Sequence, residues 1–248
     1  MQSNMRSEFV IRQSIETREA DGVTLRRLFP VAGLRNHDPF VLFDHFRLSA
    51  GQGFPTHPHR GFEAITYLFS GCMQHADDLG NHSSISAGGA QRFTAGRGIV
   101  HSEMPSDNEI TEGIQLWINL PQKFKAIEPD YQAINNHELR NEQWPGGWRR
   151  EIVGSQSPLS VRTPAEYFEL HLEAKGQYQW APRQQHVGLV YVVTGQATVN
   201  QQAIEAGFAL LVSQSRTLHF STEHGAHMMV CFGQAHGEAI HQHGPYVD

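Results

Sequence analysis

Two short motifs combine histidine and carboxylate side chains at a spacing that suits a metal ion. One residue separates His57 from His59, and one residue separates His101 from Glu103. In an extended strand, residues i and i+2 point to the same side, so each pair can present both side chains to one ion. Two antiparallel strands that bring the pairs together would supply three imidazoles and one carboxylate. Such nitrogen and oxygen donors suit Fe, Mn, Ni, Cu or Zn better than Mg or Ca.

A second carboxylate, Glu63, stands four residues after His59 and has the same parity if the strand is regular. A structural alternative for Glu63 is an ion pair with Arg60 or Arg97. The chain contains 16 histidines and only two cysteines, so a single His-x-His motif can also be surface decoration. The second motif, which like the first lies beside glycines, favours the metal site.

The other histidines have simpler interpretations. His37 and His45 are candidates to border a pocket. Three phenylalanines either form its aromatic wall or pack in the core, and they are Phe46, Phe54 and Phe62. Several histidines near the end of the chain are expected to be adventitious or on the surface: His219, His224, His227, His236, His241 and His243.

The elements that must position these residues are short strands. Apolar stretches rich in Val, Ile, Phe, Tyr and Leu, such as AITYLFSG and VGLVYVVTG, lie between turn signals. Many short strands of this kind are typical of a sandwich or barrel. The best helical candidate is short, around residues 121–129, so the sequence predicts an all-β protein with little helix.

An internal repeat divides the chain. Residues 57–71 resemble residues 181–195, and residues 87–103 resemble residues 206–222. The polar segment 135–150 connects the two units, which predicts domains at 1–134 and 135–248. Ala181, Arg183, Val187, Phe220 and Thr222 stand in the second repeat where the candidate metal residues of the first stand, and His186 and His219 are each one position away. We therefore expect a metal in the first domain and none in the second.

Composition excludes several classes of protein. A net charge of −6 and a pI of about 6.2 argue against direct binding to nucleic acid or to an anionic membrane. A mean hydropathy of −0.43, with no apolar run long enough to cross a bilayer, predicts no transmembrane helix. The N-terminus carries no apolar secretory core, so a cytoplasmic location is expected. Cys72 and Cys231 are expected to be buried free thiols.

The metal motifs and their surroundings resemble the pirin family of the cupin superfamily. The resemblance rests on the blocks 56–63 (THPHRGFE) and 94–105 (TAGRGIVHSEMP), with weaker matches at 34–46, 113–120 and 237–247. Pirins are bicupins, so the resemblance implies two tandem cupin barrels with one metal in the first. It also implies His57, His59, His101 and Glu103 as the metal ligands. Glu63, which a general cupin would use as its carboxylate ligand, would then lie close by and orient a ligand or a water.

The resemblance extends to bacterial pirin-like quercetin 2,3-dioxygenases. It implies a divalent transition metal, with Fe expected first and Mn, Ni, Cu, Co or Zn as alternatives, and a flavonol and O₂ as substrates. Glu103, or Glu63 through a water, would take the proton of the flavonol 3-hydroxyl group before O₂ reacts.

Two other functions use the same four ligands. A non-enzymatic, metal-dependent or redox-sensing regulator would bind a protein partner, such as a transcription factor or a metabolic enzyme. A cupin isomerase or hydrolase would use the metal only as a Lewis acid. An open pocket favours an enzyme, and a plugged one favours a binding module.

Overall fold

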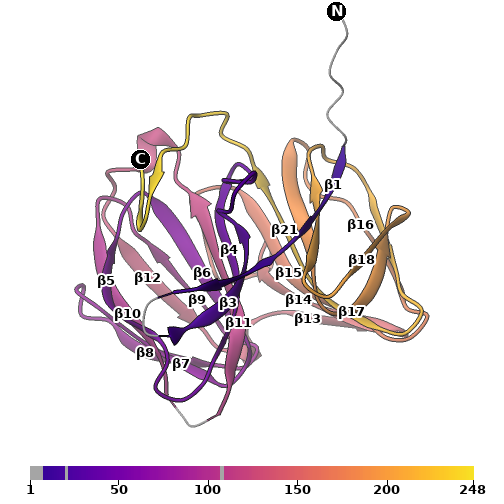
Figure 1. Cartoon of the computed structure of the whole chain (residues 1–248), viewed down its shortest axis with the longest axis horizontal. Helices are drawn as coiled ribbons and strands as arrows, with labels where there is room; N and C mark the ends of the chain where they lie inside the picture. The colour runs from indigo at the N-terminus through magenta and orange to yellow at the C-terminus, as the bar shows by residue number, and fades with distance from the viewer. Residues whose placement is uncertain (1–7, 20–21, 107–108) are drawn as a thin grey trace, which may run out of the picture.

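The computed structural model of the chain describes residues 8–19, 22–106 and 109–248. Figure 1 shows two β-barrels side by side, which confirms the all-β prediction. Within the described residues, the helical elements are the 3₁₀ turns η2 (Gln122–Phe124) and η3 (Asn136–Glu138). The helical candidate at 121–129 forms only η2, because the segment between its two prolines is too short for α-helical hydrogen bonds to offset nucleation. No helix in the described parts has the length and apolarity needed to span a membrane.

The first barrel combines two sheets. The larger contains β2 (Ile15–Arg18), β3 (Thr24–Phe29), β4 (Phe40–Leu48), β6 (Phe62–Ser70), β9 (Ala90–Thr94), β11 (Thr111–Asn119) and β12 (Asp130–Ile134). Their order in space is β12-β9-β6-β11-β4-β3-β2. The smaller sheet contains β5 (Phe54–His59), β7 (Cys72–Asp77), β8 (His82–Ser86) and β10 (Ile99–Pro105), in the order β5-β10-β7-β8.

The second barrel is built from one continuous ten-stranded arrangement. Its strands are β1 (Phe9–Gln13), β13 (Asn141–Trp144), β14 (Gly147–Val153), β15 (Ala165–Leu172), β16 (Gln177–Trp180), β17 (His186–Val199), β18 (Gln202–Glu205), β19 (Phe208–Val212), β20 (Leu218–Ser221) and β21 (Ala226–Gln234). A large apolar cluster fills its interior, including Phe168, Val190, Leu210, Phe220 and Phe232.

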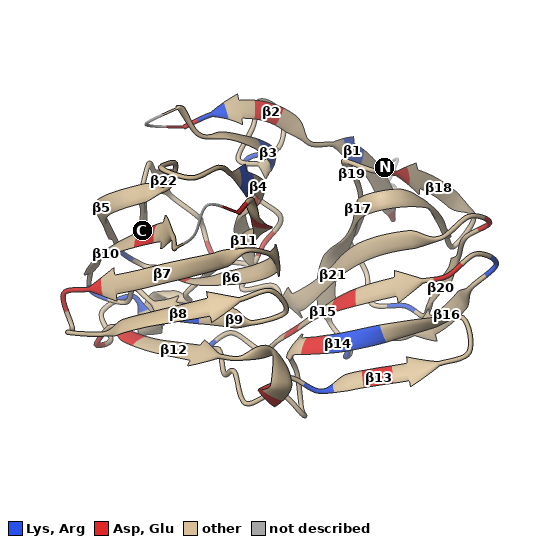
Figure 2. Cartoon of the chain, turned by 90° about the horizontal axis from the view of Figure 1, so that it is seen from below, with Lys and Arg blue, Asp and Glu red and all other residues tan. Residues whose placement is uncertain are grey.

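The central strands β9, β6 and β11 of the larger sheet of the first barrel are buried on both faces. Along β6, Phe62 and Ala64 point into the first barrel, whereas Ile65 and Tyr67 point toward the second. The cluster on that outer face joins residues of both barrels, for example Leu116 of β11 and Tyr191 of β17. Figure 2 shows the two sheets facing each other across this boundary. The barrels therefore share an apolar core as well as having their own.

The chain ends do not follow the division into two barrels. Strand pairing passes from the first sheet to the second between Ile134 and Asn141, near the expected boundary. However, β1 pairs with β19 in the second barrel. The C-terminal hairpin of β22 (Gln242–His243) and β23 (Tyr246–Val247) lies over the first barrel, and Val247 is buried in its core (Figure 1). Domain limits of 1–134 and 135–248 thus assign both chain ends to the wrong barrel.

Because the shared core belongs to both barrels, we expect them to unfold together. Leu116→Ala should lower the free energy of unfolding by about 2–5 kcal/mol, the usual cost of a buried leucine. Urea titration should show a single shifted transition. Leu79→Ala, at a side chain that is 45% exposed, is the control and should cost less than about 0.5 kcal/mol. Two separate transitions, with only one shifted by Leu116→Ala, would contradict a common core.

Candidate metal centre

Strands β5 and β10 bring the two histidine motifs together. The strands are antiparallel, and His57 lies directly opposite His101. β5 is an edge strand, which explains how it accommodates Pro58 without losing a hydrogen bond of the ladder. His101 and Glu103 are both buried while Ser102 between them is half-buried, as the alternation of a strand requires.

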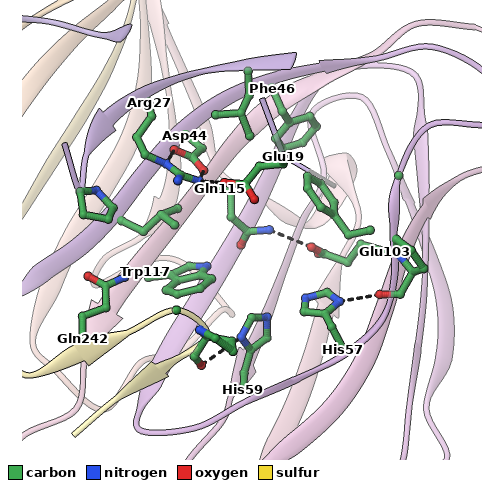
Figure 3. A pocket seen from close by; sticks show the side chains of 18 of the residues that line it. Glu19, Arg27, Asp44, Phe46, His57, His59, Glu103, Gln115, Trp117 and Gln242 are labelled. Carbon is green, nitrogen blue, oxygen red and sulfur yellow. Dashed lines mark hydrogen bonds and ion pairs between the residues drawn. The ribbon is translucent and has the colours of Figure 1, made fainter. Parts of the chain in front are cut away.

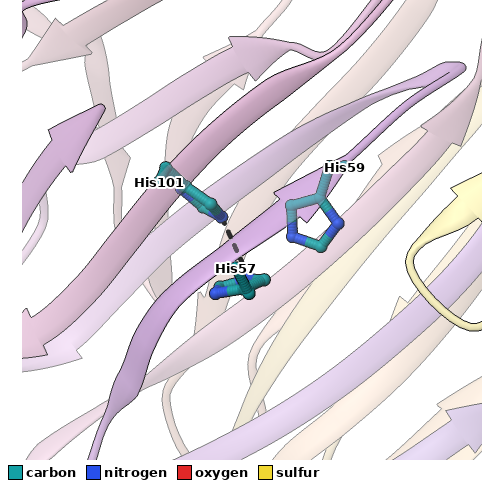
Figure 4. A group of neighbouring side chains, drawn as sticks. All are labelled: His57, His59 and His101. Atoms are coloured by element: carbon teal, nitrogen blue, oxygen red, sulfur yellow. Dashed lines mark hydrogen bonds between the residues drawn. The ribbon is translucent and has the colours of Figure 1, made fainter. Parts of the chain in front are cut away.

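The imidazole rings converge (Figure 4). The Nε2 atoms of His57 and His101 are 3.2 Å apart. Ligand atoms of His57, His59 and His101 all lie within 4.8 Å of one another. Two of the rings are oriented by carbonyl groups on their other side: His57 Nδ1 lies 2.6 Å from the Pro55 oxygen, and His59 Nδ1 lies 3.3 Å from the Pro245 oxygen. Donation of Nδ1–H to these carbonyls leaves the Nε2 lone pairs of both rings free.

The surroundings keep two of these rings neutral. His59 is stacked against Phe93, at 5.4 Å between ring centroids, and meets the edge of Trp117 at 4.9 Å. Burial, reinforced by the neighbouring imidazoles, lowers the pKa of His59 to about 3 and that of His101 to about 2. Neutral imidazole is the form that binds a metal.

The donor geometry fits a transition metal. Two nitrogens bound to one ion at about 2.1 Å lie roughly 3.0–3.4 Å apart when they subtend about 90–110°. The 3.2 Å between the Nε2 atoms of His57 and His101 falls in that range. Without an ion, one of these nitrogens must carry a proton to make the contact favourable, whereas two lone pairs directed at one cation need none.

Glu103 is held next to the histidines by donors on three other strands. Thr66 Oγ1 and Gln91 Nε2 donate to its Oε1 atom, and Gln115 Nε2 donates to Oε2 at 2.8 Å. A carboxylate has about four lone-pair sites, so this network leaves room for one more partner. Glu103 groups with His101 and His75 within 4.8 Å, although not with His57 and His59.

The structure places Glu63 away from the imidazoles. Gly61 adopts a φ of +87°, and the turn it makes ends β5 and starts β6, so strand parity does not continue from His59 to Glu63. Glu63 accepts hydrogen bonds from Thr94 Oγ1 at 2.8 Å and from the backbone N–H of Arg162 at 2.7 Å. Neither these contacts nor the cavity lining connects it to the histidines. Its carboxylate ties the first barrel to the segment that leads into β15, and neither Arg60 nor Arg97 is its partner.

Sequence reasoning missed His75. The residue is buried on β7, pairs with Glu103 across the ladder, and donates a 2.9 Å hydrogen bond from Nε2 to Asp77 Oδ2. Its ring stacks on Tyr131, with 4.0 Å between centroids. The signal was present, because His75 and Asp77 repeat the one-residue spacing of the two recognised motifs.

The histidine cluster opens into a cavity of about 510 Å³ (Figure 3). Phe46, Phe54 and Trp117 are among its walls. His37 and His45 do not border it, because both point toward the second barrel: His37 Nε2 lies 3.0 Å from the Gly188 oxygen, and His45 Nδ1 lies 3.2 Å from the Tyr191 hydroxyl. Phe62 packs behind the site, stacked on Trp117.

The comparisons with known proteins agree with this architecture. A family model described as Pirin matches residues 22–118, and one described as Pirin C-terminal cupin domain matches residues 167–248. Human pirin is 33% identical over 245 residues, covering 94% of this chain and 84% of the human protein. The chain belongs to the pirin family. Its two barrels are accordingly cupin domains, as the sequence predicted.

Two solved structures share the fold. A quercetin 2,3-dioxygenase from Acinetobacter baumannii superposes with a TM-score of 0.89 at 27% identity, covering 96% of this chain and 90% of that one. A bacterial pirin from Escherichia coli in complex with nickel(II) superposes with a TM-score of 0.76 at 21% identity, covering 92% and 99%. The histidine and glutamate cluster of this pirin-family chain can therefore hold a metal ion, and another family member binds one.

Removing one imidazole should remove the metal. We expect one equivalent of divalent transition metal per chain, and His101→Ala should lower it at least tenfold after dialysis because a buried nitrogen donor is lost. Elemental analysis measures the content. His219→Ala, on an exposed position of β20, is the control and should retain the full equivalent. Undiminished metal in His101→Ala would contradict this centre.

Glu63 should matter for stability and not for metal content. Glu63→Ala leaves the Thr94 hydroxyl and two backbone N–H groups, of Arg162 and Thr163, without their acceptor. The free energy of unfolding should fall by about 1–3 kcal/mol. Chemical denaturation and elemental analysis of the same sample separate the two effects. Loss of metal from a folded Glu63→Ala protein would show that Glu63 contributes to metal binding.

Proposed function

We propose that this pirin is a metal-dependent dioxygenase that cleaves a flavonol such as quercetin with O₂. Its metal ligands would be His57, His59, His101 and Glu103. The observation that carries the proposal is the position of the histidine cluster at one end of an open, partly aromatic cavity of about 510 Å³. That volume lies within the usual range for sites that bind small organic molecules.

The arrangement would leave a bound metal accessible to a substrate. Cavity-lining atoms come from His57, His59 and Glu103, so a ligand in the cavity reaches the same side chains that would hold the ion. A redox-active metal bound there would supply activation of the substrate for reaction with O₂. The likeness to the Acinetobacter baumannii quercetin 2,3-dioxygenase supports a flavonol as the substrate.

Glu103 is the best-placed proton acceptor in the cavity. Its three partners, Thr66, Gln91 and Gln115, all donate to it and hold the carboxylate in one orientation. Its one remaining lone pair would bind either the metal or the proton of the flavonol 3-hydroxyl group, so Glu103 would act as the base only while it is not bound to the ion. Glu63 is not assigned this role, because its carboxylate is bound by Thr94 and by the backbone of Arg162 and does not line the cavity.

The open cavity also bears on the alternative functions. A non-enzymatic regulator needs no substrate-sized space beside its metal, so the cavity favours the enzyme. A metal acting only as a Lewis acid would convert substrate without consuming O₂. A protein partner and a cytoplasmic location stay predictions.

Glu103→Ala should abolish quercetin turnover by the metal-loaded protein. Loss of a positioned base costs about 10²–10⁴-fold in rate, and loss of a ligand adds to it. An oxygen electrode, combined with the absorbance of quercetin, measures the activity, and elemental analysis reports the metal retained. Glu128→Ala, at an exposed carboxylate on the surface, should leave turnover unchanged. A fully active Glu103→Ala variant would contradict the assignment, and quercetin loss without O₂ uptake would favour the Lewis-acid alternative.

A further inference from the structure

An ion pair between half-buried Arg27 and buried Asp44 lies in the wall of the cavity, away from the histidines. Figure 3 shows Arg27 and Asp44 at the opposite side of the cavity from His57, with Gln115 between them. Arg27 Nε donates to Asp44 Oδ1 at 2.8 Å, and Arg27 Nη2 donates to Asp44 Oδ2 at 2.6 Å. A second carboxylate, Glu19, lies 2.7 Å from the same Nη2 atom.

Barrel packing alone does not explain this pair. Asp44 belongs to the row of β4 residues that faces the barrel interior, where its neighbours Leu42, Phe46 and Leu48 are buried and apolar. Asp44 itself is only 4% exposed. Burying an ion pair in place of well-packed apolar side chains seldom gains stability. Charged groups retained in the wall of a cavity are therefore candidates for ligand binding.

The unused hydrogen-bond donors and acceptors of Arg27, Asp44 and Glu19 indicate which chemical group could bind here. Arg27 uses Nε and Nη2, whereas Nη1 makes none of the hydrogen bonds found among the described residues. Asp44 and Glu19 keep free lone pairs. The two N–H groups of Nη1, beside several acceptors, complement hydroxyl groups, which both donate and accept.

An anionic ligand group would bind poorly beside Arg27, Asp44 and Glu19. A carboxylate or phosphate would have to compete with Asp44 and Glu19 for Arg27. Arg35, an exposed cation that also lines the cavity, only balances the second carboxylate. The ligand group recognised here is thus uncharged.

We propose that Arg27, Asp44 and Glu19 form a second recognition point, which binds hydroxyl groups on the part of the substrate farthest from the metal-binding group. The inference rests on the proposed function, because it places a flavonol-like substrate between the histidines and this ion pair. It makes the protein selective for polyhydroxylated aromatic substrates over those whose only hydroxyl binds the metal.

Anaerobic titration of the metal-loaded protein with two flavonols tests the inference. Quercetin carries hydroxyl groups on its outer rings, whereas 3-hydroxyflavone carries only the metal-binding one. We expect the wild type to bind quercetin at least tenfold more tightly, measured by the absorbance change of the ligand. The double variant Arg27→Met/Asp44→Leu removes both charges of the central pair and leaves only the more exposed Glu19 without its partner. It should bind both flavonols with the affinity of 3-hydroxyflavone.

A matched control comes from the second barrel. Arg149 and Glu151 form a similarly buried pair at 3.0 Å, so Arg149→Met/Glu151→Leu should keep the tenfold preference. If the cavity double variant does not fold, Glu19→Gln keeps the central pair and should weaken quercetin binding about threefold while leaving 3-hydroxyflavone unaffected.

The outcomes separate the two proposals. An unchanged preference for quercetin in the cavity variants, or no preference in the wild type, overturns the second recognition point and leaves the dioxygenase proposal intact. Failure of the wild type to bind or turn over either flavonol overturns the proposed function and this inference with it.

Discussion

The central strands of the larger sheet of the first barrel are buried on both faces, and this constraint organises the molecule. Each of its central strands must place alternate side chains in the barrel interior and in the core shared with the second barrel. On β6, Thr66 reaches Glu103 inside the barrel, whereas its neighbour Tyr67 reaches Glu169 of the second barrel. A shift of one residue in register would exchange the two sets of partners. The metal centre and the barrel interface are therefore fixed by the same hydrogen-bond ladder.

Desolvation gives the two ends of the cavity opposite properties. Near the histidines, aromatic rings and burial keep His59 and His101 uncharged, which prepares them for a cation. At the other end, burial raises the pKa of Asp44 to about 6 even though Arg27 opposes the change. The same cavity thus offers neutral nitrogen donors on one side and a compensated charge pair on the other.

The C-terminal end of the chain completes the site, although it is distant in sequence from the candidate metal ligands of the first barrel. The backbone of Pro245 orients His59, and Arg60 pairs with Asp248 at 3.0 Å. Lys125 donates to the backbone oxygens of Gly61 and Val247, which fastens the hairpin to the turn between β5 and β6. A side chain at position 61 would collide with the Val247 oxygen, so glycine is required there for space as well as for its positive φ.

The sequence by itself determined what depends on local geometry. The one-residue spacing of His57 and His59, and of His101 and Glu103, predicted that each pair lies on one side of a strand, because alternation within a strand is set by backbone stereochemistry. Short β-rich runs and the internal repeat likewise predicted two barrels, since each depends on a few neighbouring residues.

Only the tertiary structure decided which strands meet and which way each face points. Glu63 failed to join the histidines because one turn at Gly61 breaks the parity that its spacing implied. His75, Gln91 and Gln115 reached Glu103 from strands that the sequence could not place beside it. Arg27 and Asp44 became neighbours only through the pairing of β3 with β4, and β1 and the C-terminal hairpin crossed to opposite barrels. These contacts join residues distant in the chain, so their geometry is set by the packing of whole sheets and leaves no local pattern in the sequence.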